Sequence, residues 1–233
     1  MTTSSPQNGD LRRSCTRTSS DLAKKAAQFQ AAILADVNGR RGAMHGAIAP
    51  VHPTMKFAGS AITVDVRPGD NLMIHAALAI AQPGDVLVID GKGDLGAALM
   101  GAIMINQSKA IGLAGVVIDG AVRDYEELCE LGFPVFARGL NPNGPTKNAA
   151  GRINWPVSVA GVAVNPGDLV VGDADGVVVI ERENVEAVLV AAEKKVADEA
   201  ARIQGIRSGK QLRPGWLDGA LRAAGVIADG EAL

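Results

Sequence analysis

The sequence is poor in cysteine and in aromatic residues. Its 233 residues include only Cys15 and Cys129, which form neither a disulfide framework nor a metal-binding spacing. Aromatic residues make up 3% of the chain, whereas hydrophobic residues make up 47%. The core must therefore be built from Ala, Val, Ile and Leu, which suit parallel strands covered by helices. The low cysteine content also favours a reducing, cytoplasmic location.

The sequence also lacks an excess of either charge and lacks a long apolar run. Lys and Arg number 23 against 25 Asp and Glu, so no nucleic-acid partner is expected, because backbone binding needs a basic surface. No apolar segment approaches the roughly 20 residues that cross a bilayer, so no membrane partner is expected. Residues 1–20 are rich in Ser, Thr and Arg without an apolar signal-peptide core, which predicts a disordered lead-in.

Helical and strand patterns alternate through the first half of the chain. Apolar residues at steps of three and four predict one amphipathic helix from Ser20 to Gly39, followed by a long loop. Further helices are predicted at 71–82, 95–111 and 124–131, and strands at 61–66, 86–90, 115–118 and 133–137. The strands at 86–90 and 115–118 are joined through the helix at 95–111, so they are expected to form a parallel βαβ unit.

The second half of the chain changes to short apolar segments separated by turns. After a loop at 138–151, hairpin spacing predicts strands at 159–164, 169–171 and 177–180, and helices are predicted at 183–204 and 214–224. The expected fold is an α/β domain over residues 21–210, with a parallel βαβ half joined to an antiparallel half. Residues 211–233 are expected to form a C-terminal helical tail.

Charged residues follow a buried strand in the stretch Gly112 to Asp124, GLAGVVIDGAVRD. The crevice beyond the carboxyl ends of parallel strands is where α/β proteins bind ligands. Arg123 offers a planar cation for a carboxylate, and Asp124 offers an oxygen donor for a divalent metal. Alternatively, Asp124 is only the N-cap of the next helix, since aspartate is favoured there. The position of the pair leaves both interpretations open.

A second motif competes with this site. Residues 91–96 read G-x-G-x-x-G directly after a predicted strand, and Asp119 follows Gly96 by 23 positions, as in a dinucleotide-binding unit. Against this, the chain turns to hairpins after Phe136 instead of adding βαβ units, and Asp94 would place a carboxylate among amides meant for a pyrophosphate. The amides at the start of the predicted helix suit a small carboxylate better.

Four segments carry a resemblance to a known family: PGDNLMIHAAL, GDVLVID, GVVIDGAVRD and PGDLVVGDADGVVVI. The chain from about residue 30 to 205 resembles the family of regulator of ribonuclease activity A and the 4-hydroxy-4-methyl-2-oxoglutarate or 4-carboxy-4-hydroxy-2-oxoadipate aldolases. The resemblance implies a β/β/α three-layer sandwich of the swivelling-domain type, assembled as a homotrimer or homohexamer with sites between subunits. For the aldolases it implies cleavage of a 2-oxo acid to pyruvate with Mg²⁺ or Mn²⁺.

The resemblance also implies roles for particular residues. Asp124 matches the direct metal ligand, and Arg123 matches the arginine that pairs with the substrate's oxygens and stabilises developing charge. Ile103 and Met104 match positions whose backbone amides hold the pyruvyl carboxylate. Glu199 matches a glutamate that reaches a neighbouring subunit's metal through water. By itself Glu199 would be an ordinary solvated charge on its helix.

One position departs from the family pattern. The aldolases have an acid after the glycine of this helix, whereas here the run is Gly101-Ala102-Ile103-Met104. That acid orders a metal-bound water in the aldolases, and groups of this kind typically contribute about 10- to 100-fold in metal affinity or activity. Asp94, expected a turn earlier at the helix start, is a candidate substitute.

The sequence therefore predicts a class II, divalent-metal lyase that cleaves a small 2-oxo acid through a pyruvate enolate. Retro-aldol cleavage and oxaloacetate decarboxylation share this enolate, so both remain open. The alternative is a non-catalytic regulator that binds a protein partner; the regulators lack an aspartate after the arginine, whereas this chain has Asp124. His75 matches a family histidine, although a lone helical histidine is more often a core residue. Lys147 is either a contact for a distal substrate carboxylate or a solvated lysine.

Overall fold

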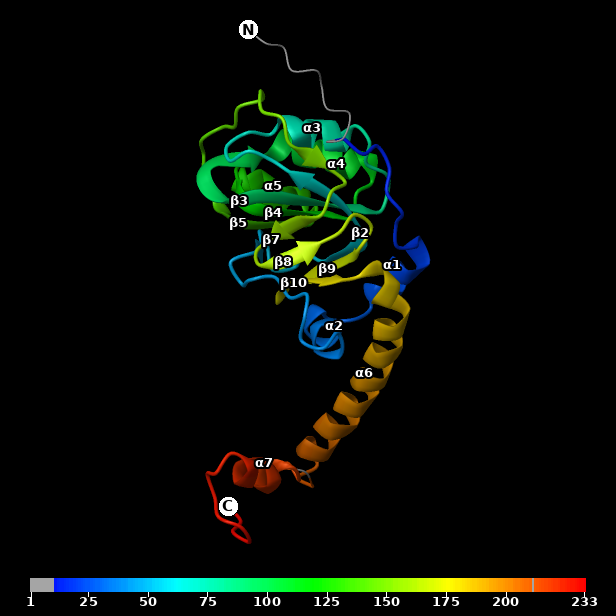
Figure 1. The fold of residues 1–233 in the computed structure, drawn as a ribbon, viewed down its shortest axis with the longest axis vertical. Coiled ribbons are helices and arrows are strands. Elements are labelled where there is room, and N and C mark those ends of the chain that lie inside the picture. Colours follow the sequence, from blue (N-terminus) through cyan, green and yellow to red (C-terminus); the bar gives the residue numbers. More distant parts are fainter. Residues whose placement is uncertain (1–10, 211) are drawn as a thin grey trace. The chain divides into compact units, whose positions relative to one another are not determined.

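A mixed sheet of eight strands forms the centre of the fold (Figure 1). The computed structural model describes residues 11–210 and 212–233. The strand order is β1-β5-β4-β3-β2-β9-β10, with β6 paired to β2, and strands β2, β3, β4 and β5 are parallel. The strands are β1 (Ala49–Pro50), β2 (Phe57–Asp65), β3 (Asp85–Met100), β4 (Gly115–Val122), β5 (Val135–Leu140), β6 (Arg152–Ile153), β9 (Leu169–Asp173) and β10 (Gly176–Ile180).

Helices and a separate hairpin complete the layers. Strands β7 (Val157–Val159) and β8 (Val162–Val164) pair antiparallel in a second sheet. The helices are α1 (Ser20–Ala26), α2 (Ala31–Val37), α3 (Leu72–Leu78), α4 (Ala102–Ile111), α5 (Tyr125–Leu131), α6 (Val185–Arg207) and α7 (Leu217–Ala223), with a 3₁₀ turn η1 (Arg182–Asn184). The predicted α/β fold, a β/β/α sandwich with a parallel and an antiparallel half, is confirmed.

The chain divides into two units within α6. The first unit is Met1–Ala192 and the second is Glu193–Leu233. The predicted division into a domain at 21–210 and a C-terminal tail stays a prediction. The second unit contains the remainder of α6 and the short helix α7. Among the helices of the described residues, none is both long and apolar enough to cross a membrane.

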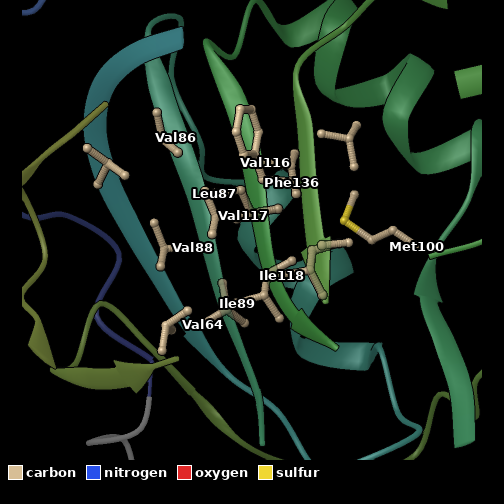
Figure 2. Close-up of a cluster of buried hydrophobic side chains, with 14 of the residues drawn as sticks. Val64, Val86, Leu87, Val88, Ile89, Met100, Val116, Val117, Ile118 and Phe136 are labelled. Atoms are coloured by element: carbon tan, nitrogen blue, oxygen red, sulfur yellow. The ribbon is translucent and has the colours of Figure 1, made fainter. Parts of the chain in front are cut away.

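The core of the first unit is aliphatic, as the composition predicted. Figure 2 shows side chains of β3 and β4, from Val86 to Ile89 and from Val116 to Ile118, lying along neighbouring parallel strands. All seven of these side chains are fully buried. Two of the few aromatic residues, Phe57 and Phe136, meet edge to face with ring centroids 5.1 Å apart. Because these strands are buried on both faces, they read as continuous apolar runs in the sequence.

The single helix predicted from Ser20 to Gly39 is wrong, because the chain forms two helices there. Helix α1 ends at Ala26 and α2 begins at Ala31. The N–H of Ala31 donates to Asp173 Oδ2 at 2.8 Å, so a carboxylate from β9 binds the first turn of α2. The apolar spacing continues across the break because both helices bury side chains in the same hydrophobic cluster. A long-range contact therefore overrides the local period.

The helix predicted at 95–111 is wrong over its first seven residues. Strand β3 continues to Met100, and α4 begins at Ala102 after the N-cap Gly101. Lys92 and Gly93 both have positive φ, and the pairing of β3 with β4 shifts register on either side of Asp94. The G-x-G-x-x-G segment is thus a bulged strand that opens no helix, which removes the context that a dinucleotide site needs.

Part of the expected disordered lead-in is packed on the sheet. Residues 1–10 lie outside the described residues, but Thr18 is buried and its N–H donates to the carbonyl of Gly167 at 3.1 Å. Arg17 donates two hydrogen bonds to the buried Asp85, at 2.7 and 2.9 Å. A buried carboxylate needs such a partner, so the segment just before α1 is held in place.

Candidate active site

Arg123 and Asp124 lie where β4 ends. The Arg123 N–H donates to the carbonyl of Met100 at 3.1 Å, which keeps the chain beside the end of β3. Asp124 has a positive φ of 63°, a strained backbone for a residue other than glycine. Its Oδ2 lies 3.8 Å from Arg123 Nε, and both side chains are more than one third exposed. Such strain persists at positions that the surrounding structure holds firmly, and it is concentrated at functional sites.

The carboxylate of Asp124 binds the start of α4 rather than the start of its own helix. Its Oδ2 accepts a hydrogen bond of 2.9 Å from the Ala102 N–H, and it makes no side-chain cap hydrogen bond to α5. Asp124 therefore occupies the N-cap position of α5, as the alternative predicted, but its side chain does not cap that helix. The contact joins the end of β4 to the first turn of α4, as the βαβ geometry predicted.

Gly101 makes this close approach possible. A Cβ atom at this position would overlap Asp124 Oδ2 and would lie 2.9 Å from Arg123 Cγ. Its backbone is extended, with φ of −147°, so the requirement for glycine comes from space and not from a left-handed conformation. Arg123 and Asp124 thus pack against the backbone of Gly101, where no side chain stands in the way.

A cavity of about 150 Å³ adjoins the pair. Four of the residues predicted from the resemblance line it, namely Arg123, Asp124, Ile103 and Met104. The side chain of Ile103 is 83% exposed, whereas that of Met104 is buried. Their N–H groups lie in the first turn of α4, where a helix provides no acceptor of its own. These amides are available for an anionic group such as a carboxylate.

Lys147 also lines the cavity, and Asp70 holds the loop that carries it. The carboxylate of Asp70 accepts hydrogen bonds from the Thr146 hydroxyl at 2.7 Å and from the N–H groups of Asn148 at 2.8 Å, Leu72 at 3.0 Å and Ala149 at 3.2 Å. Burial raises the pKa of Asp70, but these donors outweigh it and lower the pKa to about 2. The loop residues on both sides of Lys147 are therefore held by hydrogen bonds to the Asp70 carboxylate, which stays charged near neutral pH.

Asn71 and His75 line the cavity from α3. Burial, together with the charge of Lys147, lowers the pKa of His75, so its imidazole is neutral near pH 7. His75 was a candidate from the sequence, whereas Asn71 was expected only as the start of a helix. The spacing of four residues is the one signal in the sequence, since it puts the N-cap Asn71 one turn before His75.

Asp94 is not among the residues that line this cavity, and Glu199 belongs to the other unit of the chain. Asp94 lies in β3 opposite Gly120, so its predicted place at a helix start is wrong, and it does not substitute there for the missing acid at Ala102. Glu199 lies on the part of α6 that belongs to the second unit, where its Oε1 is 3.0 Å from Lys195 Nζ. Its reach to a neighbouring subunit's metal stays a prediction.

Asp124 is the one carboxylate among the residues that line the cavity. Within the described part of the chain, no three His, Cys, Asp or Glu side chains gather into a metal site built from protein groups alone. Asp124 Oδ1 accepts no hydrogen bond from the residues that the structure describes, so it is open to a ligand. Mg²⁺ is commonly held by one or two carboxylates, with water and substrate oxygens in its other positions. The donor set fits that kind of site.

Comparisons of the sequence and the fold with known proteins identify named relatives. A family model described as RraA-like, Aldolase/RraA, matches residues 19–179. A protein of Halalkalibacterium halodurans, provisionally named a 4-hydroxy-4-methyl-2-oxoglutarate aldolase, is 46% identical over 159 residues, which cover 68% of this chain and 76% of the relative.

Two solved structures are also similar. Streptomyces coelicolor RraAS2, described as an unusual member of the RNase ES inhibitor RraA protein family, has a TM-score of 0.74 and 27% identity, covering 81% of this chain and 99% of that chain. The RNA-processing inhibitor RraA from Thermus thermophilis has a TM-score of 0.60 and 32% identity, covering 65% of this chain and 92% of that chain.

Proposed function

Because this chain belongs to the RraA-like family, we propose that it is a divalent-metal lyase that cleaves a small 2-oxo acid and releases pyruvate. The observation that carries the proposal is the joining of Arg123, Asp124 and the first turn of α4 around one cavity. A guanidinium, a carboxylate and unpaired helix amides are the groups that a 2-oxo acid and a metal need together.

The amides and the guanidinium would bind the pyruvyl end of the substrate. The N–H groups of Ile103 and Met104 would hold its carboxylate at the start of α4. Arg123 would donate to the keto oxygen, where negative charge grows as the C3–C4 bond breaks. A donor aimed at developing charge lowers the barrier without binding the ground state equally well.

A metal held by Asp124 would supply a Lewis acid for the same oxygen. When the C3–C4 bond of a 4-hydroxy-2-oxo acid breaks, its electron pair passes to the pyruvate enolate, and the C4 hydroxyl gives its proton to water and becomes a carbonyl. The enolate would then take up one proton at C3 to give pyruvate, so that no net proton is gained or lost. Oxaloacetate would give the same enolate with loss of CO₂. We include in the proposal a trimer or hexamer in which Glu199 of a neighbouring copy completes the metal site through water.

The alanine at position 102 sets an expectation for rate. With alanine in place of the aldolases' acid, the metal site would have one fewer charged group near its water shell. We expect metal affinity or activity about 10- to 100-fold below that of a site with the acid, the scale for losing such a group.

The experiment is a pyruvate-release assay on a panel of 2-oxo acids with added Mg²⁺ or Mn²⁺. The panel includes 4-hydroxy-4-methyl-2-oxoglutarate, 4-hydroxy-2-oxoglutarate and oxaloacetate. We expect release with at least one acid, and loss of release when EDTA removes the metal. A folded protein that released no pyruvate from any of them would contradict the proposal.

The second candidate is a regulator that binds a protein partner. It is favoured by the similarity to two proteins described as inhibitors of RNA processing or of an RNase, and by the missing acid at Ala102. Against it stands Asp124, whose second carboxylate oxygen, Oδ1, accepts no hydrogen bond from the described residues and would have no task in a purely protein-binding surface. Failure on the whole panel, together with inhibition of a ribonuclease, would establish this alternative.

A further inference from the structure

Two buried polar atoms beside the cavity have no hydrogen-bond partner among the described residues. They are Asn71 Oδ1 and His75 Nε2. Asn71 is only 3% exposed, so water reaches it poorly. Buried polar atoms are almost always paired, and an exception at a cavity suggests that a ligand provides the partner.

The orientation of the Asn71 amide is fixed by its other contacts. Its Nδ2 donates to the carbonyl of Leu99 at 2.9 Å and contacts Met104 Sδ at 3.2 Å. A carbonyl oxygen only accepts hydrogen bonds, so exchanging the amide nitrogen and oxygen would place two acceptors against each other. Oδ1 therefore remains the unpaired atom, and it needs a donor.

Asn71 is the N-cap residue of α3, and His75 lies one turn into that helix, with its N–H donating to the Asn71 carbonyl at 3.2 Å. The two residues are four positions apart, and both line the cavity. Its imidazole, neutral near pH 7, can carry its proton on Nε2 and then donate a hydrogen bond. The two side chains thus offer one acceptor and one donor to the same ligand.

We propose that Asn71 and His75 form a subsite for a hydroxyl group of the ligand. The hydroxyl proton is donated to Asn71 Oδ1, and the hydroxyl oxygen accepts from His75 Nε2. A carboxylate has no proton to donate to Asn71, and a methylene group has neither a donor nor an acceptor. The hydroxyl group is the simple substituent of an oxo acid that satisfies both atoms.

This inference rests on the proposed function and narrows it. A 4-hydroxy-2-oxo acid carries a hydroxyl group next to the bond that breaks, whereas oxaloacetate carries none in its keto form. The subsite therefore favours aldol cleavage of a hydroxylated substrate over decarboxylation. Leaving Asn71 Oδ1 unpaired should penalise a ligand that lacks the hydroxyl group, because a buried acceptor without a donor is costly.

The test uses two ligands that differ only in the hydroxyl group. The value of kcat/KM is measured for 4-hydroxy-2-oxoglutarate, and the inhibition constant is measured for 2-oxoglutarate, both with the same metal. Asn71→Leu and His75→Leu should each lower kcat/KM by about 10-fold or more, the scale of one hydrogen bond to a buried group. The inhibition constant of 2-oxoglutarate should change by less than about 3-fold.

His75→Leu is the cleaner variant, because no hydrogen bond from the described residues to the His75 side chain would be lost. Asn71→Leu also removes the contacts of Asn71 with Leu99 and Met104. Leu72→Ala is the control for a substitution at the start of α3 outside the cavity, because Leu72 is exposed, and it should change neither constant. Equal effects of His75→Leu on both ligands, or no effect on either, would overturn the subsite. If the wild-type protein released no pyruvate from any 2-oxo acid, the proposed function would fail instead, and the subsite with it.

Discussion

Removing the charge of Asp70 should destabilise the protein and loosen the loop that carries Lys147. Asp70→Asn keeps the size of the side chain but replaces a charged acceptor of four hydrogen bonds with an amide. A fall of the carboxylate pKa from the usual 3.8 to about 2 corresponds to roughly 2 kcal/mol of native stability. Asp70 itself is 2% exposed, but the loop is exposed, so we expect a loss of about 1–2 kcal/mol.

The sign of the pH dependence follows from the direction of the shift. Because folding lowers this pKa, the stabilisation is fully present above the unfolded value near 4 and is lost as the pH falls through about 2. Urea unfolding at pH 7 and pH 3 should therefore show the wild type losing part of its advantage over Asp70→Asn at the lower pH. Hydrogen exchange of the Asn148 and Ala149 amides, which donate to Asp70, should become faster in the variant at pH 7.

Asp94→Asn is the matched control, because the same chemical change is made where the structure shows no hydrogen bond to the carboxylate in the described chain. It should leave the free energy of unfolding within about 0.5 kcal/mol of the wild type, the usual range for such a surface substitution. An Asp70→Asn variant as stable as this control at pH 7, with unchanged exchange of the loop amides, would refute the reasoning.

Three further substitutions test the site itself. Gly101→Ala should displace the Asp124 carboxylate and lower pyruvate release by roughly 10²-fold with a normal unfolding curve, since misplacement by about 1 Å is enough for such a loss; an active variant would contradict the packing argument. Ala102→Asp should tighten Mn²⁺ binding about 10-fold in a calorimetric titration, and unchanged affinity would show that the missing acid is compensated elsewhere. Arg123→Lys should lower kcat by roughly 10²-fold, and a normal kcat would remove Arg123 from the proposed chemistry.

Elements in both halves of the fold could be predicted where their signals are local. The apolar run from Val116 to Ile118 and the turns between β8, β9 and β10 appear directly in the sequence. The break between α1 and α2 could not be predicted in this way, because the cap on Ala31 comes from Asp173, 142 positions away. The extension of β3 to Met100 likewise depends on its pairing with Val122 of β4.

For the site, the sequence predicted where some of the residues lie but not all of them. The βαβ order implies that the end of β4 meets the start of α4, and the hydrogen bond from Ala102 to Asp124 has that geometry. The mistake over Asp94 followed from the glycine motif, which was read as a helix start. Asn71 was missed because its unpaired oxygen becomes visible only when the carbonyl of Leu99 is seen to hold its nitrogen.

The most direct test of the central claim is the rate of pyruvate release by the wild type and by Asp124→Asn, measured side by side with saturating Mg²⁺ or Mn²⁺. Asparagine can still accept the hydrogen bond from Ala102, so the fold and the helix start are kept while the charge is removed. We expect metal-dependent release by the wild type and none above the metal-only background by the variant. Equal release by both proteins would contradict the assignment of Asp124 as the residue that holds the metal.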